Sequence, residues 1–130
     1  MVTAPRRPVH TYSIVAVDEA AGEMGVAVQS HWFSVGSVVP WAEAGIGAVA
    51  TQSFVNQSFG PRGFQLLRKG GSPAEVVEQL LREDPAAPMR QLAVIDCHGN
   101  AAAHTGERCV PEAWRPHGGR HRRRRGPRWR

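Results

Sequence analysis

Apolar residues alternate with a period of two at the start of the chain, follow a helical period in the middle, and return to a period of two near residue 91. Residues 12–18 (YSIVAVD) are apolar on both alternating sets of positions, which is typical of a strand covered on both faces. Residues 19–22 predict a turn that ends in glycine, and residues 23–30 (EMGVAVQS) predict a returning strand. The short link favours an antiparallel hairpin.

One face of the second strand carries no large side chain. Gly25, Ala27 and Gln29 lie on it, and such small residues favour the close approach of another layer. Residues 31–36 then predict an irregular turn, and residues 37–41 an extended segment around a proline.

The next strand ends on the same polar pair as the second. Residues 45–53 (GIGAVATQS) predict this strand, and both strands end in Gln-Ser. If the two ends meet, they bring Gln29, Ser30, Gln52 and Ser53 to one edge of a sheet. The alternative is that both pairs are ordinary strand ends that enter loops.

Two helices follow. Residues 59–69 (FGPRGFQLLRK) have a helical apolar spacing, and the glycines at 70–71 end it. Residues 72–75 (SPAE) form a capping box with proline at the first helical position, and an Asp-Pro pair at 84–85 ends the second helix. The apolar stripe of this helix consists of Val76, Val77, Leu80 and Leu81.

The chain then returns to strands. Residues 91–96 (QLAVID) predict a buried strand, residues 97–100 a hairpin turn, and residues 101–105 the start of a partner strand. The order β-β-β-α-α-β-β predicts an α+β fold in which helices pack on one face of antiparallel sheet.

Charge is distributed unevenly along the 130 residues. The net charge is +5, but eight arginines and no acid lie from Arg115 onward. Residues 1–114 therefore hold eight basic and eleven acidic side chains, a net charge of −3. No apolar run approaches the roughly 18 residues of a membrane span, and the N-terminus lacks the apolar region of a secretory signal. We expect a cytoplasmic protein without a membrane partner.

Both ends of the chain differ from its body. Residues 1–10 are a basic, proline-containing extension. Residues 111–130 (PEAWRPHGGRHRRRRGPRWR) have no apolar period. This composition predicts a disordered segment or an arginine-rich segment that folds on nucleic acid. The abrupt change after Val110 favours a third interpretation, which is translation of GC-rich DNA in a shifted frame.

The two cysteines predict no metal site. Cys97 and Cys109 lack the spacing of a metal clip, and in a chain without an export signal we expect reduced thiols. A site that adds His98 and His104 would match none of the usual zinc patterns. We expect no cofactor.

Three stretches carry a resemblance to a known family: HTYSIVAVD, GVAVQSHWFSVGSVVPWAEAGIGAVATQSFVNQSFGPRG and QLAVIDCHGNAAAHTGERC. They resemble the bacterial family called domain of unknown function 1028, which is grouped by resemblance with the N-terminal nucleophile (Ntn) hydrolases. The likeness runs from about Thr11 to Val110, so we expect one domain over residues 11–110. The resemblance implies a four-layer αββα sandwich of antiparallel sheets. We expect it to be incomplete here, because family members continue past this point.

The resemblance also implies a chemistry. In an Ntn hydrolase the first residue of the mature chain attacks an amide or peptide carbonyl, and its own α-amino group, with a pKa of about 7.7 to 8.0, acts as the base. Thr11 occupies that place, but only cleavage of the bond after His10 would free its amine. Proteasome-type relatives place an Asp and a Lys beside the nucleophile. Here the second strand ends in Gln-Ser-His, and the single lysine, Lys69, lies at a helix end.

Other polar residues could take over the supporting roles. Ser30 and His31 are candidates for catalytic support, with the imidazole as a base at neutral pH. Gln52 and Asn56 are candidate pocket or oxyanion donors, and His104 is a candidate substrate contact. For Ser30 and His31 the alternative is a solvated polar pair at a strand end, which is the more common case, and a strand-end turn explains His104 equally well.

Three functions remain open from the sequence. The first is a hydrolase of a small-molecule or peptide substrate, and the second is a non-catalytic small-ligand or interaction module on the same scaffold. The third, nucleic-acid binding through the arginine-rich tail, ranks last. Self-association into a homo-oligomer is left open.

Overall fold

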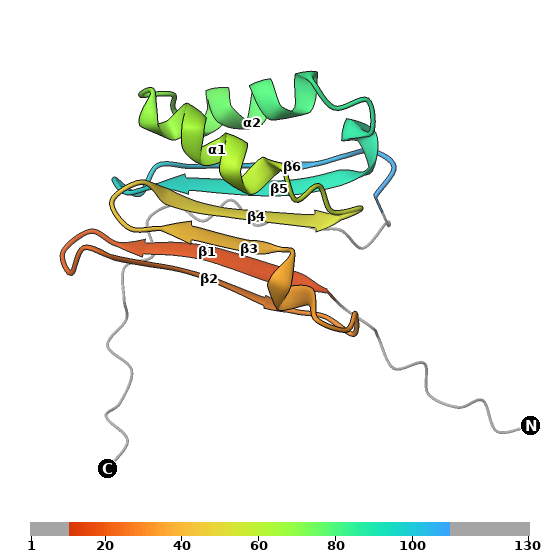
Figure 1. Ribbon diagram of the computed structural model, residues 1–130, viewed down its shortest axis with the longest axis horizontal. Coiled ribbons are helices and arrows are strands. Elements are labelled where there is room, and N and C mark those ends of the chain that lie inside the picture. The colour runs from red at the N-terminus through yellow and green to blue at the C-terminus, as the bar shows by residue number, and fades with distance from the viewer. Residues whose placement is uncertain (1–10, 110–130) are drawn as a thin grey trace, which may run out of the picture.

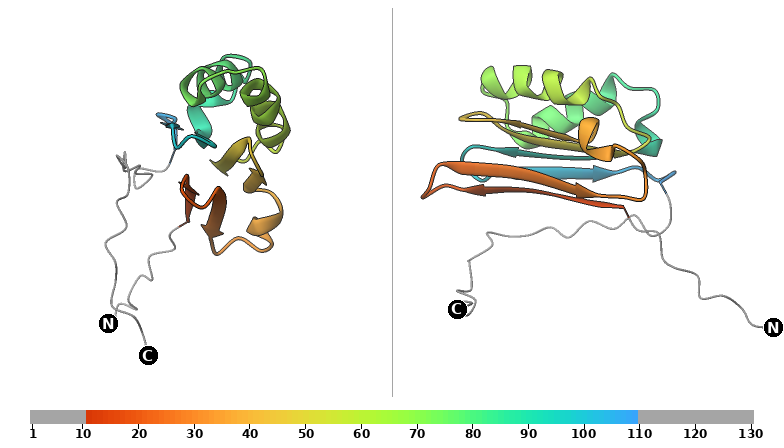
Figure 2. Two further views of the ribbon diagram at one scale, coloured as in Figure 1. Left: turned by 90° about the vertical axis from the view of Figure 1, so that its left-hand side faces the viewer. Right: turned by 60° about the horizontal axis from the view of Figure 1, so that its bottom comes forward.

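Two helices, a four-stranded sheet and a two-stranded sheet lie in three successive layers in the computed structural model, which describes residues 11–109 (Figures 1 and 2). In chain order the elements are β1 (Tyr12–Asp18), β2 (Glu23–Gln29), η1 (Val35–Ser37), β3 (Pro40–Glu43), β4 (Gly47–Ser53), α1 (Phe59–Arg68), α2 (Pro73–Arg82), η2 (Ala87–Met89), β5 (Arg90–Asp96) and β6 (Ala101–Thr105). The α+β class is confirmed. The predicted order lacked β3, because the extended segment around Pro40 pairs with β4 and is a strand of its own.

The strands form two antiparallel sheets. β1 and β2 make the predicted hairpin, while β3, β4, β5 and β6 pair in that order in the second sheet. The prediction that Gln29 and Gln52 end at one edge of a single sheet was therefore wrong. β2 and β4 belong to different sheets, and their ends lie at the same end of two stacked layers (Figure 1).

Both helices cover one face of the four-stranded sheet, as predicted (Figure 1). The hydrophobic core lies between the helices and the sheet. It consists of Val49, Phe59, Phe64, Val76, Val77, Leu80, Leu92 and Val94. The capping box of α2 is formed: Ser72 Oγ accepts from the Glu75 N–H at 3.3 Å, and the Ser72 N–H donates to Glu75 Oε2 at 2.8 Å. At the start of α1, Gly60 lies against the ring of Trp41, with no room for a Cβ between them.

The opposite face of the sheet packs against the β1–β2 hairpin. Strand residues alternate between faces, so the neighbours of Val49 and Leu92 in sequence point toward the hairpin. They are mostly alanines, and Ala48 and Ala50 are fully or almost fully buried. Side chains of this size let the two sheets approach closely.

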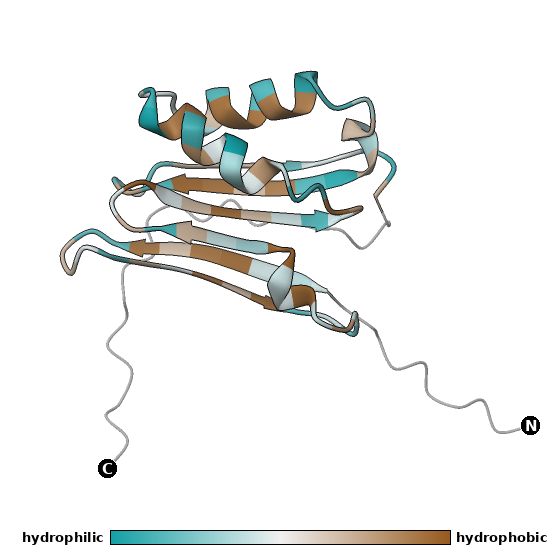
Figure 3. Cartoon of the chain, viewed as in Figure 1, coloured by the Kyte–Doolittle hydropathy of each residue, from teal (hydrophilic) through white to brown (hydrophobic). Residues whose placement is uncertain are grey.

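The outer face of the hairpin is open within the described residues, contrary to the prediction that β1 is covered on both faces. Tyr12 and Ile14 are 64% and 60% exposed, and Gly25 and Ala27 are also exposed. The physical reason is that residues 11–109 supply a packing layer on one side of the hairpin only. Figure 3 shows that hydrophobic residues make up much of β1.

Some predictions fall outside the described part of the chain. The extension at residues 1–10 lies there, as do residues 110–130, and with them the alternatives of disorder, a shifted frame or nucleic-acid binding. Among residues 11–109, no helix is long and apolar enough to cross a membrane.

Candidate functional site

The hydroxyl groups of Thr11 and Ser30 meet at one end of the hairpin. Thr11 directly precedes β1 and Ser30 directly follows β2, and the pairing of Tyr12 with Gln29 brings the two together. Thr11 Oγ1 lies 2.8 Å from Ser30 Oγ, and Ser30 Oγ also accepts a hydrogen bond from the Trp32 N–H at 3.1 Å. Thr11 is exposed. The structure therefore holds an accessible hydroxyl pair at this end.

No basic side chain among residues 11–109 joins this pair. His31 is exposed and makes no hydrogen bond with another residue between 11 and 109. Lys69 is at the end of α1, and the four-stranded sheet separates this helix from the hairpin (Figure 1). The structure thus brings Ser30 to Thr11, but neither His31 nor Lys69.

Gln52 is the second component at this end of the molecule. It is 4% exposed, and its Nε2 has no hydrogen-bond partner within the described residues. In the register, Gln52 pairs with Gln91, which pairs with Thr105, and Gln91 Nε2 donates to Thr105 Oγ1 at 3.3 Å. By strand alternation this polar row faces the hairpin. The end of β4 and the start of β1 lie at the same end of the layers (Figures 1 and 2).

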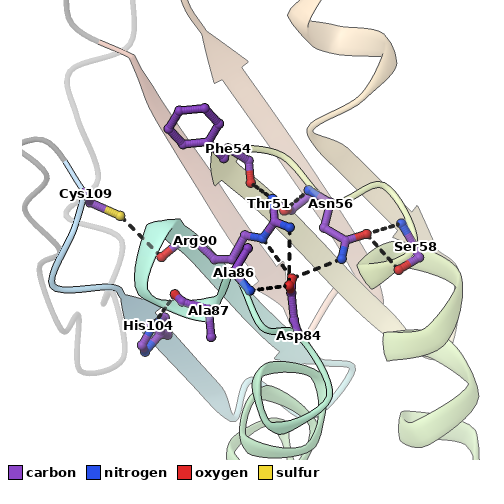
Figure 4. A network of polar contacts seen from close by, with 10 residues as sticks. All are labelled: Thr51, Phe54, Asn56, Ser58, Asp84, Ala86, Ala87, Arg90, His104 and Cys109. Atoms are coloured by element: carbon purple, nitrogen blue, oxygen red, sulfur yellow. Dashed lines mark hydrogen bonds and ion pairs between the residues drawn. The ribbon is translucent and has the colours of Figure 1, made fainter.

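Asn56 lies on the other side of β4, and its amide is engaged (Figure 4). Its Nδ2 donates to Asp84 Oδ2 at 3.1 Å, and its Oδ1 accepts from the Ser58 N–H and hydroxyl at 3.1 and 2.8 Å. Its backbone N–H donates to Thr51 Oγ1 at 3.4 Å. These contacts order the loop between β4 and α1, and they give both Nδ2 and Oδ1 of Asn56 a protein partner.

A buried ion pair completes this network (Figure 4). Arg90 donates to Asp84 through Nε at 2.8 Å and Nη2 at 3.3 Å, and its Nη1 donates to the Phe54 carbonyl. Burial alone would raise the pKa of Asp84. Hydrogen bonds from Arg90, the Ala86 N–H and Asn56, together with the charge of Arg90, outweigh burial and hold this pKa below its ordinary value of 3.8. Sequence reasoning missed the pair, because Asp84 fitted a helix end and Arg90 lay outside the predicted strand at residues 91–96.

His104 also lies away from Thr11. It pairs in register with the core residue Leu92, so it is on the helix-facing side of β6. Its Nε2 lies 3.4 Å from the carbonyl oxygen of Ala87, a contact that joins β6 to η2. Cys109 Sγ donates to the Arg90 carbonyl at 3.4 Å, and both cysteines are free thiols. Residues 11–109 contain no group of three or more His, Cys, Asp or Glu side chains suited to a metal ion.

The loops beside Thr11 and Gln52 hold the strained and apolar residues of this end. Ser34 and Ser53 have φ angles of 59° and 65° and are the non-glycine residues with positive φ in the described range. Such conformations cost free energy and concentrate at functional sites. Trp32, Phe33 and Phe54 in the same loops are 70%, 93% and 65% exposed. The end of the sheets is thus surrounded by exposed aromatic side chains.

Comparison with known families shows to which protein family the chain belongs. The model of the "Family of unknown function (DUF1028)" matches residues 11–122. The chain belongs to this family. The DUF1028 match begins at Thr11 and extends past Val110, where we expected the likeness to end, into the arginine-rich segment.

A crystal structure supports the same assignment. A DUF1028 protein from Silicibacter pomeroyi is similar to this chain with a TM-score of 0.75 and 33% sequence identity, and the match covers 78% of this chain. It covers 46% of the Silicibacter protein, so the chain spans less than half the length of that relative. No curated protein matches the chain.

Proposed function

We propose that this DUF1028 protein is an acyl hydrolase that cleaves amide or peptide bonds, with Thr11 as the nucleophile of an Ntn-type αββα sandwich. Two observations support the scaffold. The described layers run helix, sheet, sheet, and the exposed apolar face of the hairpin lies where a fourth layer would pack. The family match also begins at Thr11.

The hydrogen bond between Thr11 and Ser30 is the observation that carries the proposal. When Thr11 donates to Ser30, its own lone pairs are free to attack, and Ser30 can pass the proton on. The α-amino group of a processed Thr11 is the base that receives it. His31 follows Ser30 directly and is exposed, so we assign it the role of a secondary proton acceptor.

The reaction then follows acyl-transfer chemistry. Thr11 Oγ1 attacks the acyl carbon, the C–N bond breaks, and the departing amine takes the proton that the base removed. Water next attacks the Thr11 ester, releases the acid and restores the hydroxyl. Backbone N–H groups at the strand ends would stabilise the oxyanion.

A free amine requires cleavage of the bond between His10 and Thr11. An N-to-O acyl shift provides one route: Thr11 Oγ1 attacks the His10 carbonyl, and water hydrolyses the resulting ester. The purified protein is then expected to lack residues 1–10 by intact-mass analysis. A hydroxyl-directed acylating probe should modify Thr11.

Three variants make this test specific. Thr11→Ala should keep residues 1–10 and resist the probe, whereas Thr11→Ser should retain both reactions. Ser13→Ala is the control, because Ser13 is a hydroxyl residue of β1, two positions after Thr11 and on the same alternating set. A wild-type chain that keeps residues 1–10 and gains no adduct at Thr11 would refute the proposal.

The second candidate is a non-catalytic small-ligand module. The buried, unpaired Gln52 amide and the exposed aromatic residues around it favour this function, since neither depends on Thr11 chemistry. Its signature is ligand binding that Thr11→Ala leaves unchanged, in a wild-type protein whose Thr11 is never acylated. Turnover that depends on Thr11 would contradict it.

A further inference from the structure

We propose that the end of β4 and β5 which faces the hairpin binds a neutral carbonyl group, with Gln52 Nε2 as the hydrogen-bond donor. Gln52 is 4% exposed, and its Nε2 has no partner within the described residues. Folded proteins rarely bury an amide N–H group without an acceptor, because its lost hydration is then not replaced. An acceptor supplied by a ligand satisfies this group.

The other side-chain amides near Gln52 already donate hydrogen bonds within the protein. Gln91 Nε2 already donates to Thr105 Oγ1, so the amide of Gln91 is occupied. Asn56, the other amide near the end of β4, donates to Asp84 on the helix-facing side. Gln52 is therefore the amide whose donor is unpaired here.

The charges at this end favour a neutral acceptor over a carboxylate. The residue that begins β5, Arg90, is engaged by Asp84 in the network between the sheet and the helices. A carboxylate beside Gln52 would thus be buried without a cation, which is strongly unfavourable. An amide or ester carbonyl accepts a hydrogen bond without this penalty.

Access to Nε2 is through the end of the sheets. Gln52 is the last buried residue of β4, and the next two residues, Ser53 and Phe54, are exposed. Because Nε2 itself is buried, the Gln52 side chain would have to rotate toward this exposed end for a ligand to reach it. The start of β1 and the end of β2, next to which Thr11 and Ser30 stand, lie at the same end (Figure 1). This inference deepens the proposed function, since the bound carbonyl is the group that Thr11 would attack.

The test uses the side-chain amide of Gln52 as its own reporter. In ¹⁵N-labelled full-length protein, its NH₂ signals are assigned by their loss in Gln52→Leu. We expect benzamide to shift these signals, and benzoate, of similar shape but charged, to bind at least about tenfold more weakly. Gln52→Leu should bind benzamide about tenfold more weakly, which is the effect of one lost hydrogen bond. Gln65→Leu, which removes an exposed amide on α1, should bind like the wild type.

Gln52→Leu should keep or raise the melting temperature, because it removes an unpaired buried group. Its loss of affinity then reports the lost donor and not a lost fold. If Gln52→Leu does not fold, triple-resonance experiments on the wild type assign the Gln52 side-chain signals, and their shifts with benzamide decide the question. Gln52 signals that do not respond to benzamide, or equal affinity in a folded Gln52→Leu protein, overturn the inference.

The experiment also separates this inference from the proposed function. Thr11→Ala should bind benzamide like the wild type. Benzamide binding at Gln52 in a protein whose Thr11 is never acylated would refute the hydrolase and retain the carbonyl site. Acylation of Thr11 without a response of the Gln52 signals to benzamide would support the hydrolase and refute the carbonyl site.

Discussion

Asp84 Oδ2 and Arg90 Nε lie 2.8 Å apart and connect the end of α2 to the start of β5. Their side chains are 6% and 14% exposed. Asn56 joins the pair from the loop after β4, and the Phe54 carbonyl accepts from Arg90. The ion pair thus holds the segment that directly follows Gln52, without contacting the Thr11 hydroxyl.

Removal of one partner should therefore be costly. We expect Arg90→Leu to lower the free energy of unfolding by about 3–5 kcal/mol, because it leaves the buried Asp84 carboxylate without a cation. Urea denaturation followed by circular dichroism measures this change. Arg82→Gln is the control, since Arg82 pairs with Glu78 on the exposed face of α2, where such pairs contribute at most about 1 kcal/mol. Equal losses in the two variants would show that Arg90 has no special structural role.

The same pair predicts acid sensitivity. The folded-state pKa of Asp84 lies below its ordinary value of 3.8, so its contribution to stability is fully present above that value. It is lost as the pH falls below about 4 toward the lower, folded-state pKa, because the unfolded chain then binds the proton first. Unfolding free energies measured between pH 6 and pH 2 should decline less steeply in Asp84→Asn than in the wild type. Parallel curves would contradict this assignment.

Gly60→Ala should destabilise the protein, although alanine favours a helix over glycine by about 1 kcal/mol. A Cβ at Gly60 would lie 2.2 Å from Cδ2 of Trp41, a rigid and partly buried ring. We expect a net loss of about 1–3 kcal/mol, seen as a lower melting temperature. Gly25→Ala is the matched control, since nothing lies within 4 Å of its Cβ. A more stable Gly60→Ala protein would show that α1 moves away from β3 at little cost.

Ile14→Thr tests what covers the outer face of the hairpin. With 60% of Ile14 exposed, we expect a change in unfolding free energy within about 0.5 kcal/mol. Val49→Thr, at a position that is 0% exposed in the core, should cost about 1–3 kcal/mol because it buries a hydroxyl. If the two losses are similar in urea denaturation, another segment or a second copy packs on this face in solution.

Elements that depend on residues close in sequence were predictable. Contacts between elements far apart in sequence, and the number of layers that cover a strand, were not. The capping box at Ser72 and the hairpin of β1 and β2 both depend on residues close in sequence. The exposed face of β1 was not predictable, because an apolar strand pattern does not reveal how many layers are present to cover it. The pairing of Asp84 with Arg90 depends on the path of the chain between α2 and β5, on which no periodic pattern bears.

The candidate site shows the same division. Thr11 and Ser30 stand one residue outside the two ends of a hairpin, so their contact follows from its register. The free donor of Gln52 could not be inferred, because it depends on which strand neighbours accept its hydrogen bonds. Asn56 illustrates the converse: its sequence position was similar, yet the loop that follows β4 turns its amide toward Asp84.

The alanines of β4 and β5 control the spacing of the proposed site. Ala48, Ala50 and Ala93 lie between the sheet that carries Gln52 and the hairpin that carries Thr11. Their size sets the thickness of this layer, and so the separation between the proposed nucleophile and the donor proposed to hold its target. A single added methyl group there would move these two side chains apart without changing either of them. Under the proposed function, the rate would therefore depend on apolar residues that never touch the substrate.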